Sequence, residues 1–436
     1  MKHCVSILLL IALTGSAIGI TCPRGFSAVN NQKCLRLFNN NIKHLEAEND
    51  CSYLGGTLVT IKTAIDNRAV TNMAASASAQ NVWIGVYCFA VGNTTTCYHD
   101  DNSGVLNYTS FAAGNPAVQA NGGCVYMATT GKNAGQWFSA PCEVIGMPFV
   151  CEVPPTFADK NCTRNYYGYC YMPSHEIKSS SANSTTYDEA ESICEANGGT
   201  LASIHSKPEL DYIRAIYRNT NIQKIFLGAQ AFLPDTFDWQ DGTNWDYDYT
   251  NPLATTSGDC LQMDLTAGKP NNGMWSETDC GSSLYFLCKR RITPTPGVMA
   301  QEVKKQGRVN PKFRKSRKAL PHRQELLDFS NCNSTLYMSP GVITSFGYPN
   351  SKPPVAYCTW SVAALGPYRV GIYFTDFSVY EDVFIYDEFG NVVSAPSGTQ
   401  RPFQVLGDTN LLKLVHDSRY DANYGYTGFS ATVLPF

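Results

Sequence analysis

The spacing of the cysteines constrains the fold of this chain more than any other feature of its sequence. The 436 residues contain 17 cysteines, and all but Cys4 lie after residue 19. The 16 that remain are an even number, which is typical of an exported protein whose domains are held by disulfides. No two of them have the Cys-x-x-Cys spacing that would favour a zinc site built from thiolates.

The N-terminal segment and the glycosylation sequons also indicate export. Residues 1–19 have the features of a signal peptide: the basic Lys2, an apolar run over 5–13 and a small-x-small end at 17–19. A membrane anchor is the alternative, but a spanning helix needs about 20 apolar residues. Sequons for N-glycosylation occur at Asn93, Asn107, Asn161, Asn183 and Asn333. We therefore expect a secreted, extracellular glycoprotein with no transmembrane anchor.

The chain contains an internal repeat. Cys51 and Cys194 are each followed by Gly-Gly-Thr-Leu, at 55–58 and 198–201. Further pairs keep a nearly constant offset: Cys124 with Cys260, Trp137 with Trp275, Cys142 with Cys280 and Cys151 with Cys288. Such a pattern indicates a duplicated domain with loops of variable length.

Each copy has the same expected order of elements. Apolar periodicity predicts amphipathic helices over 41–54 and 185–198, each ending near the repeated cysteine. A second helix follows in each copy, and in the second copy Ser206 and Glu209 form a capping-box pattern. Short β-like runs come next, at 81–88 and 224–230.

These features resemble the C-type lectin-like domain. They include the Gly-Gly-x-Leu after the first helix, the Trp-Ile-Gly-Val at 83–86 with its counterpart at 226–229, and the Trp-x-x-x-x-Cys pairs. The resemblance covers residues 22–152 and 162–289. It implies an α+β fold with two helices, two small antiparallel sheets and a long loop region that carries the binding site.

The resemblance also implies a disulfide pairing. Two bridges join the first helix to the last strand of each copy, two brace the long loops, two close N-terminal hairpins, and one is extra in the first copy. The expected pairs are Cys51–Cys151, Cys194–Cys288, Cys124–Cys142, Cys260–Cys280, Cys22–Cys34, Cys162–Cys170 and Cys88–Cys97.

A basic linker precedes a third domain. Residues 289–331 hold 12 Lys/Arg against 3 Asp/Glu, and 290–331 lack periodicity, which is typical of an exposed spacer. Attraction to acidic glycans or anionic surfaces is the alternative function of this segment, and Arg314-Lys-Ser-Arg317 resembles a processing site.

Residues 332–436 resemble a CUB domain, an antiparallel β-sandwich. The resemblance is carried by Gly341-Val-Ile343-Thr-Ser345 with Tyr348-Pro349, Cys358-Thr-Trp360, Asp382-x-x-Ile385-Tyr-Asp387 and Gly428-Phe429. This domain has only Cys332 and Cys358, and lacks the usual second cysteine pair. Many CUB domains bind calcium, and Asp382 and Asp417 match two acidic ligand positions; the alternative is two solvated loop aspartates.

The resemblance also places a candidate calcium-dependent sugar site in the lectin-like loops. The first copy lacks the ligands, because Phe138-Ser139 follows Trp137 and Gly122 stands two residues before Cys124. The second copy keeps a degraded set of oxygen-bearing side chains. These candidate ligands for Ca²⁺ and sugar are Asn251, Asp259, Ser276 and Glu277.

We predict different positions for two sets of aromatic residues. Trp137 and Trp275 are predicted to lie in the cores, because the loop sheet needs a large apolar anchor. The run 237–252 also holds Trp245, Tyr247 and Tyr249, and unassigned alternate positions in it could face outward and bind a sugar ring or a protein partner.

The leading interpretation is a secreted recognition protein without catalysis. It resembles the nematode-type secreted proteins that join lectin-like and CUB domains, a resemblance that implies glycan binding and innate immunity. An extracellular adhesion or matrix protein that binds cell-surface proteins is the alternative. No His-Glu-x-x-His or Gly-x-Ser-x-Gly motif favours an enzyme, and we expect no nucleic-acid partner.

Overall fold

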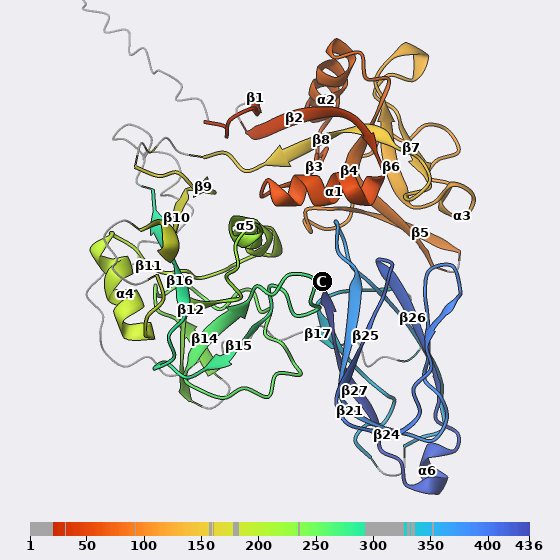
Figure 1. Cartoon of the computed structure of the whole chain (residues 1–436). Helices are drawn as coiled ribbons and strands as arrows, with labels where there is room; N and C mark the ends of the chain where they lie inside the picture. Colours follow the sequence, from red (N-terminus) through yellow and green to blue (C-terminus); the bar gives the residue numbers. More distant parts are fainter. Residues whose placement is uncertain are drawn as a thin grey trace, which may run out of the picture.

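The computed structural model describes residues 21–30, 32–91, 93–156, 159, 161–177, 183–233, 236–292, 327–328, 332, 336–350 and 353–436. The expected signal peptide, most of the basic linker and Asn333 lie outside these residues. The other four sequons, at Asn93, Asn107, Asn161 and Asn183, lie on the exposed surface. Figure 1 shows three bodies, with the first at the top, the second at the lower left and the third at the lower right.

The first body is an α+β domain built on one sheet. Its strands run in the order β1-β2-β8-β4-β6-β7, with β3 paired to β8 and β5 paired to β4. The strands are β1 Ser27–Val29, β2 Lys33–Ile42, β3 Thr57–Leu58, β4 Asn81–Val91, β5 Thr94–His99, β6 Cys124–Ala128, β7 Trp137–Ala140 and β8 Met147–Val153. The helices are α1 His44–Tyr53, α2 Ala64–Ser76 and α3 Val118–Asn121.

The second body repeats this topology strand for strand. Its order is β9-β10-β16-β12-β14-β15, with β11 paired to β16 and β13 paired to β12. The strands are β9 Asn165–Tyr166, β10 Tyr169–Pro173, β11 Thr200–Leu201, β12 Lys224–Leu233, β13 Thr236–Trp239, β14 Cys260–Asp264, β15 Trp275–Thr278 and β16 Tyr285–Arg291. The helices are α4 Tyr187–Ala196 and α5 Lys207–Tyr217. The duplication inferred from the cysteine offsets is therefore also a duplication of topology.

The second helix of each copy begins at a side-chain cap. Thr63 accepts a hydrogen bond from the Asp66 amide, and Ser206 accepts one from the Glu209 amide. The expected capping box of α5 forms only in part, because the Glu209 carboxylate accepts a hydrogen bond from the His205 amide rather than from Ser206.

Eight disulfides lie among the described residues, and seven of them are the pairs that the family resemblance implies for the lectin-like domains. The longest-range bridges are Cys51–Cys151 and Cys194–Cys288, each joining the first helix of a lectin-like domain to its last strand. Bridges of this span stabilise a fold by roughly 4–5 kcal/mol in the chain-entropy model. The others are Cys22–Cys34, Cys88–Cys97, Cys124–Cys142, Cys162–Cys170, Cys260–Cys280 and Cys332–Cys358.

The third body is a two-sheet β-sandwich. One sheet has the order β17-β19-β27-β21-β24 with β25 paired to β21, and the other has the order β18-β20-β26-β22-β23. The strands are β17 Leu327–Asp328, β18 Tyr337–Met338, β19 Gly341–Thr344, β20 Tyr357–Ala363, β21 Val370–Val379, β22 Phe384–Tyr386, β23 Val392–Ser394, β24 Gly398–Gln400, β25 Phe403–Leu406, β26 Leu411–Asp417 and β27 Gly428–Pro435, with α6 at Asp421–Tyr424. Trp360, Phe374 and Phe429 fill the space between the sheets and are fully buried.

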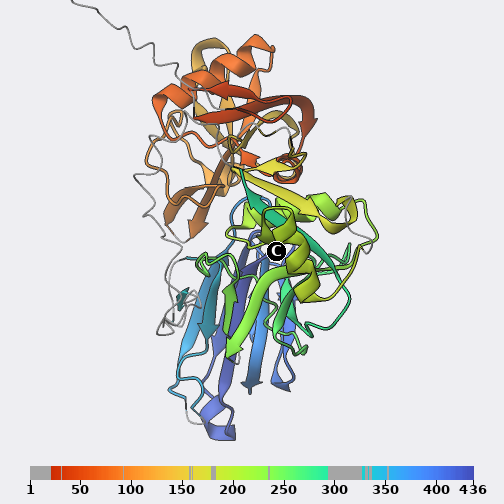
Figure 2. The same cartoon turned by 90° about the vertical axis from the view of Figure 1, so that its left-hand side faces the viewer.

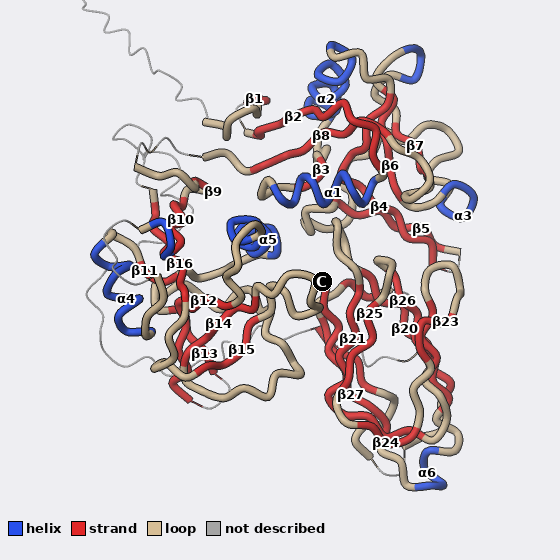
Figure 3. The backbone as a smooth tube through the Cα atoms, in the orientation of Figure 1, coloured by secondary structure: helices blue, strands red, loops and turns tan. Residues whose placement is uncertain are grey.

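The three bodies share hydrophobic clusters. Tyr373 and Leu434 of the sandwich pack into the core cluster of the second domain. Ala363 and Leu365 of the sandwich pack with the first domain around Trp83. Figures 1 and 2 show the C-terminus where the three bodies meet, and Figure 3 shows α1 and α5 on the faces that the two lectin-like domains turn toward this junction.

Candidate functional site

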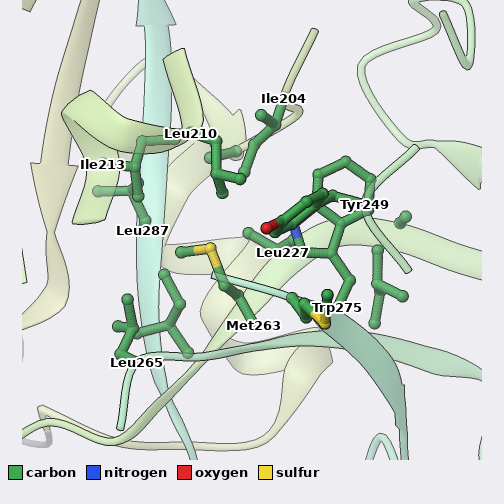
Figure 4. Close-up of a cluster of buried hydrophobic side chains, with 14 of the residues drawn as sticks. Ile204, Leu210, Ile213, Leu227, Tyr249, Met263, Leu265, Trp275 and Leu287 are labelled. Carbon is green, nitrogen blue, oxygen red and sulfur yellow. The ribbon is translucent and has the colours of Figure 1, made fainter. Parts of the chain in front are cut away.

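The long loop of the second domain is anchored on Trp275. The Trp275 amide donates a hydrogen bond to the Tyr249 carbonyl, and the Trp275 carbonyl accepts one from the Asn251 amide. The Trp275 side chain is fully buried beside Tyr249 and Met263 (Figure 4). Trp137 is buried in the same way in the first domain, so the prediction that both tryptophans belong to the cores is confirmed.

Two of the three aromatic side chains named in the long loop are buried and do not face outward. Trp245 and Tyr249 are 8% and 1% exposed. Trp245 stacks on Trp239 at a ring-centroid distance of 4.7 Å and meets Trp275 edge-on at 5.6 Å. Tyr247 is half-buried and also meets Trp275 edge-on. These rings are buried because the long loop, which has little regular secondary structure, needs a small core of its own.

Asn251 precedes Pro252 as Asn115 precedes Pro116 in the first domain, but the two asparagines do not occupy matching places in the structure. The Asn251 amide donates to the Trp275 carbonyl, and in the first domain the amide that donates to the matching Trp137 carbonyl is that of Ala112. Asn251 is therefore the counterpart of Ala112 and lies three residues before the position of Asn115. In addition, its Oδ1 accepts a hydrogen bond from the Leu253 amide, so it supports a local turn.

The other three candidate ligands are spread along the same loop and strand. Ser276 Oγ accepts a hydrogen bond from Gln262 Nε2. Glu277 is half-exposed on β15, and Asp259 is exposed just before β14. A calcium ion needs six to eight oxygen ligands at one point. Two of the four candidate oxygens are bonded within the fold, so this set does not fit a calcium ion.

The two ends of the long loop nevertheless lie against the residues on either side of Glu277 in β15. The loop begins at Thr250, which forms a β-bridge with Trp275. It returns at Gly258, where an added Cβ would lie 2.2 Å from the Thr278 carbonyl oxygen. Residues 254–257 between these ends are exposed. Both ends of the loop therefore flank β15, the strand that carries Glu277.

The matching place in the first domain is closed by hydrogen bonds. The Ser139 amide and Oγ both donate to Asn115 Oδ1, at 3.1 and 3.2 Å, and Ser139 Oγ accepts from the Ala117 amide at 2.8 Å. Ser139 is 5% exposed. The amide oxygen of Asn115 is thus used inside the protein.

In the CUB domain Asp417 ends β26, and Asp382 lies two residues before the neighbouring strand β22. The register that pairs Phe384 with Val415 would place Asp382 opposite Asp417 if it continued by two residues. Asp417 is bound by Arg419, whose Nη2 lies 2.6 Å from Asp417 Oδ2. Burial opposes the shift, but this guanidinium lowers the pKa of Asp417 below its usual value. Arg419 supplies the positive charge that calcium would bring, so this pair does not fit a calcium site either.

One arrangement that the sequence analysis missed has the connectivity of a hydrolase triad. His205 Nε2 lies 3.0 Å from Ser203 Oγ, and His205 Nδ1 lies 2.7 Å from Asp246 Oδ1. However, Ser203 is 1% exposed and its hydroxyl donates to Asp241 Oδ2 at 2.6 Å. A nucleophile must reach its substrate, so these residues form a structural network.

The fold and its loops define a protein with two C-type lectin folds followed by a CUB sandwich. The Lectin C-type domain model matches residues 41–153 and 183–290, and the CUB domain model matches 332–432. The chain belongs to the C-type lectin family. Within the described residues, no helix is both long enough and apolar enough to cross a membrane.

Several known proteins are similar to parts of this chain. C-type lectin domain-containing protein 38 of Caenorhabditis elegans is 33% identical over 281 residues, which are 64% of this chain and 70% of that protein. C-type mannose receptor 2 of Homo sapiens is 24% identical over 282 residues, which are 61% of this chain but 18% of the receptor. The solved carbohydrate-recognition domain of cow CD23 is 26% identical, covers 31% of this chain and 97% of that domain, and gives a TM-score of 0.27.

Proposed function

We propose that this protein is a secreted, non-catalytic recognition protein of innate immunity that binds glycans without calcium through the second lectin domain. The observation that carries the proposal is the contrast between the two loop regions. The loop of the first domain is closed by Ser139 and Asn115. The loop of the second domain exposes residues 254–257, and both of its ends flank the strand that carries Glu277.

The chemistry of this surface supports a polar ligand. Glu277 and Asp259 provide carboxylates, which accept hydrogen bonds from the hydroxyl groups of a sugar. Since the aromatic side chains of the loop are mostly buried, ring stacking contributes little, and hydrogen bonds to the loop provide the recognition. Secretion is supported by the apolar N-terminal segment and by the disulfides, which persist in oxidising compartments.

A glycan array probed with the full chain, in calcium and in EGTA, tests this proposal. We expect saturable binding to a subset of glycans, equal in the two buffers, because neither candidate calcium set fits the ion. A signal that EGTA abolishes would show that calcium recognition survives despite the altered ligands and would contradict the calcium-free mode.

Adhesion to an extracellular or cell-surface protein is a second candidate function. It is favoured by the exposed aromatic side chains at the far end of the CUB domain, where Tyr380 and Tyr424 stack at 4.2 Å and are 42% and 60% exposed. Exposed tyrosines are enriched at protein interfaces. A blank glycan array together with saturable binding to a matrix or cell-surface protein would support this function over glycan recognition.

A further inference from the structure

A buried group of metal-ligand side chains lies in the first lectin domain, away from the loop region. His44 and Glu48 lie one turn apart on α1, and Asp100 directly follows β5. Their potential ligand atoms all lie within 4.8 Å of one another, and His44 Nδ1 lies 3.7 Å from Glu48 Oε2. Across the described part of the chain, no other three His, Cys, Asp or Glu residues come together in this way.

The polar atoms of this group lack partners. The three residues are 2%, 3% and 2% exposed. Within the described structure, His44 Nε2, Glu48 Oε1 and both carboxylate oxygens of Asp100 are buried without a hydrogen-bond partner. The two carboxyl groups face each other, and the Gly366 amide faces Asp100, but none of these four atoms has a partner at full hydrogen-bond geometry. A buried polar atom left unpaired costs about 1–3 kcal/mol, which a bound ligand would offset.

Two carboxylates and one imidazole face one another in this pocket. The facing cation is Arg369 of the CUB domain, but among the described contacts no ion pair joins it to either carboxylate. A divalent cation would balance two carboxylates and a neutral imidazole to zero net charge.

We propose that His44, Glu48 and Asp100 bind one divalent transition-metal ion, with zinc as the best match, at a structural site between α1 and the CUB domain. An imidazole with two carboxylates suits zinc, whereas calcium and magnesium prefer oxygen ligands alone. A spacing of four residues puts His44 and Glu48 on one face of the helix. The CUB loop closes the site, since an added Cβ on Gly366 would lie 3.4 Å from the Asp100 carbonyl oxygen.

The second lectin domain provides an internal comparison. Tyr187 begins α4 where His44 begins α1, and Glu191 stands three residues before Cys194 as Glu48 stands before Cys51. Gln240 stands in the place of Asp100. The Asp100 amide donates a hydrogen bond to the Gly85 carbonyl, and the Gln240 amide donates one to the carbonyl of the matching glycine, Gly228. Glu191 accepts a hydrogen bond from the Leu201 amide. The ligand set is therefore specific to the domain that the CUB loop covers.

Metal analysis of the full-length secreted protein tests the proposal. After exhaustive dialysis into metal-free buffer, mass spectrometry should find one zinc ion per chain in the wild type and in the matched control Glu191→Gln. Glu48→Gln and Asp100→Asn should lose it, because even the loss of an outer-sphere partner lowers metal affinity about 10- to 100-fold.

A second readout on the wild type does not depend on the variants folding. A zinc-selective chelator, added in the presence of excess calcium, should lower the unfolding temperature, and added zinc should restore it. The proposal is overturned if the wild type retains no metal and if zinc, cobalt and manganese all leave the unfolding temperature unchanged. Glycan binding is not part of either readout, so failure of this site leaves the proposed function standing.

Discussion

At the scale of single residues, the paired glycines after the first helix of each lectin domain are required by close backbone approach. Gly55 and Gly198 have φ of 80° and 77°, which ends the helix in a left-handed conformation. The next glycines touch the last strand: an added Cβ would lie 2.0 Å from the Glu152 carbonyl oxygen at Gly56 and 2.5 Å from that of Lys289 at Gly199. The repeated Gly-Gly-Thr-Leu is therefore a packing motif.

The substitution Gly56→Ala tests this role. The new methyl group would push against backbone rather than a movable side chain, so we expect a loss of about 1–3 kcal/mol in the free energy of unfolding. The matched control is Gly281→Ala, where the nearest atoms lie 3.5 Å away on the Asp279 side chain; it should be neutral. Denaturant titration of both variants measures the difference. Equal stability of the two variants would contradict the packing role.

At the scale of elements, α5 connects the three bodies through one buried carboxylate. Asp211 Oδ1 binds Lys207 Nζ at 2.8 Å and Arg214 Nη1 at 3.0 Å on its own helix. Asp211 Oδ2 accepts hydrogen bonds from Tyr368 of the CUB domain at 2.7 Å and from Ser52 of the first lectin domain at 3.3 Å. The carboxylate is thus fully used by groups from all three bodies.

The pH dependence of the junction follows from this carboxylate. Burial alone would raise the pKa of Asp211, but Lys207 and Arg214 outweigh it and hold the pKa below 3.8. A carboxyl group whose pKa is lowered on folding contributes stability above its unfolded pKa and loses that contribution as the pH falls through its folded pKa. We expect the three bodies to separate below about pH 4, as an increase in radius of gyration in small-angle X-ray scattering.

The variant Asp211→Asn tests whether this carboxylate causes the separation of the three bodies at low pH. Removing one partner from a buried ion pair typically costs about 3–5 kcal/mol, so the variant should unfold more easily at neutral pH and lose the acid-dependent step. An acid transition that is unchanged in Asp211→Asn would assign the step to another residue and contradict the role of this junction.

At the scale of the whole molecule, the sequence predicts the disulfide-bonded domains but not the contacts that depend on side-chain packing. Cysteine spacing and the glycine motif are local signals, so the duplication, the α+β fold and the sandwich could be predicted. The position of Asn251 and the burial of Trp245 could not, because a loop with little regular secondary structure is shaped by the core it forms. Asp211 also carried no signal, since its partners come from domains far apart in the sequence.

The central claim is that the second lectin domain, not the first, presents the ligand surface. Ser139 and Glu277 are a matched pair, because each stands two residues after the repeated tryptophan of its domain. Binding of the full chain to a glycan selected from the array, measured by surface plasmon resonance for Ser139→Ala and Glu277→Ala, tests the claim most directly. We predict about 10- to 100-fold weaker binding for Glu277→Ala, because a lost hydrogen bond to a charged group is worth about 1.5–3 kcal/mol, and unchanged binding for Ser139→Ala. Weakened binding in Ser139→Ala with full binding in Glu277→Ala would contradict the claim.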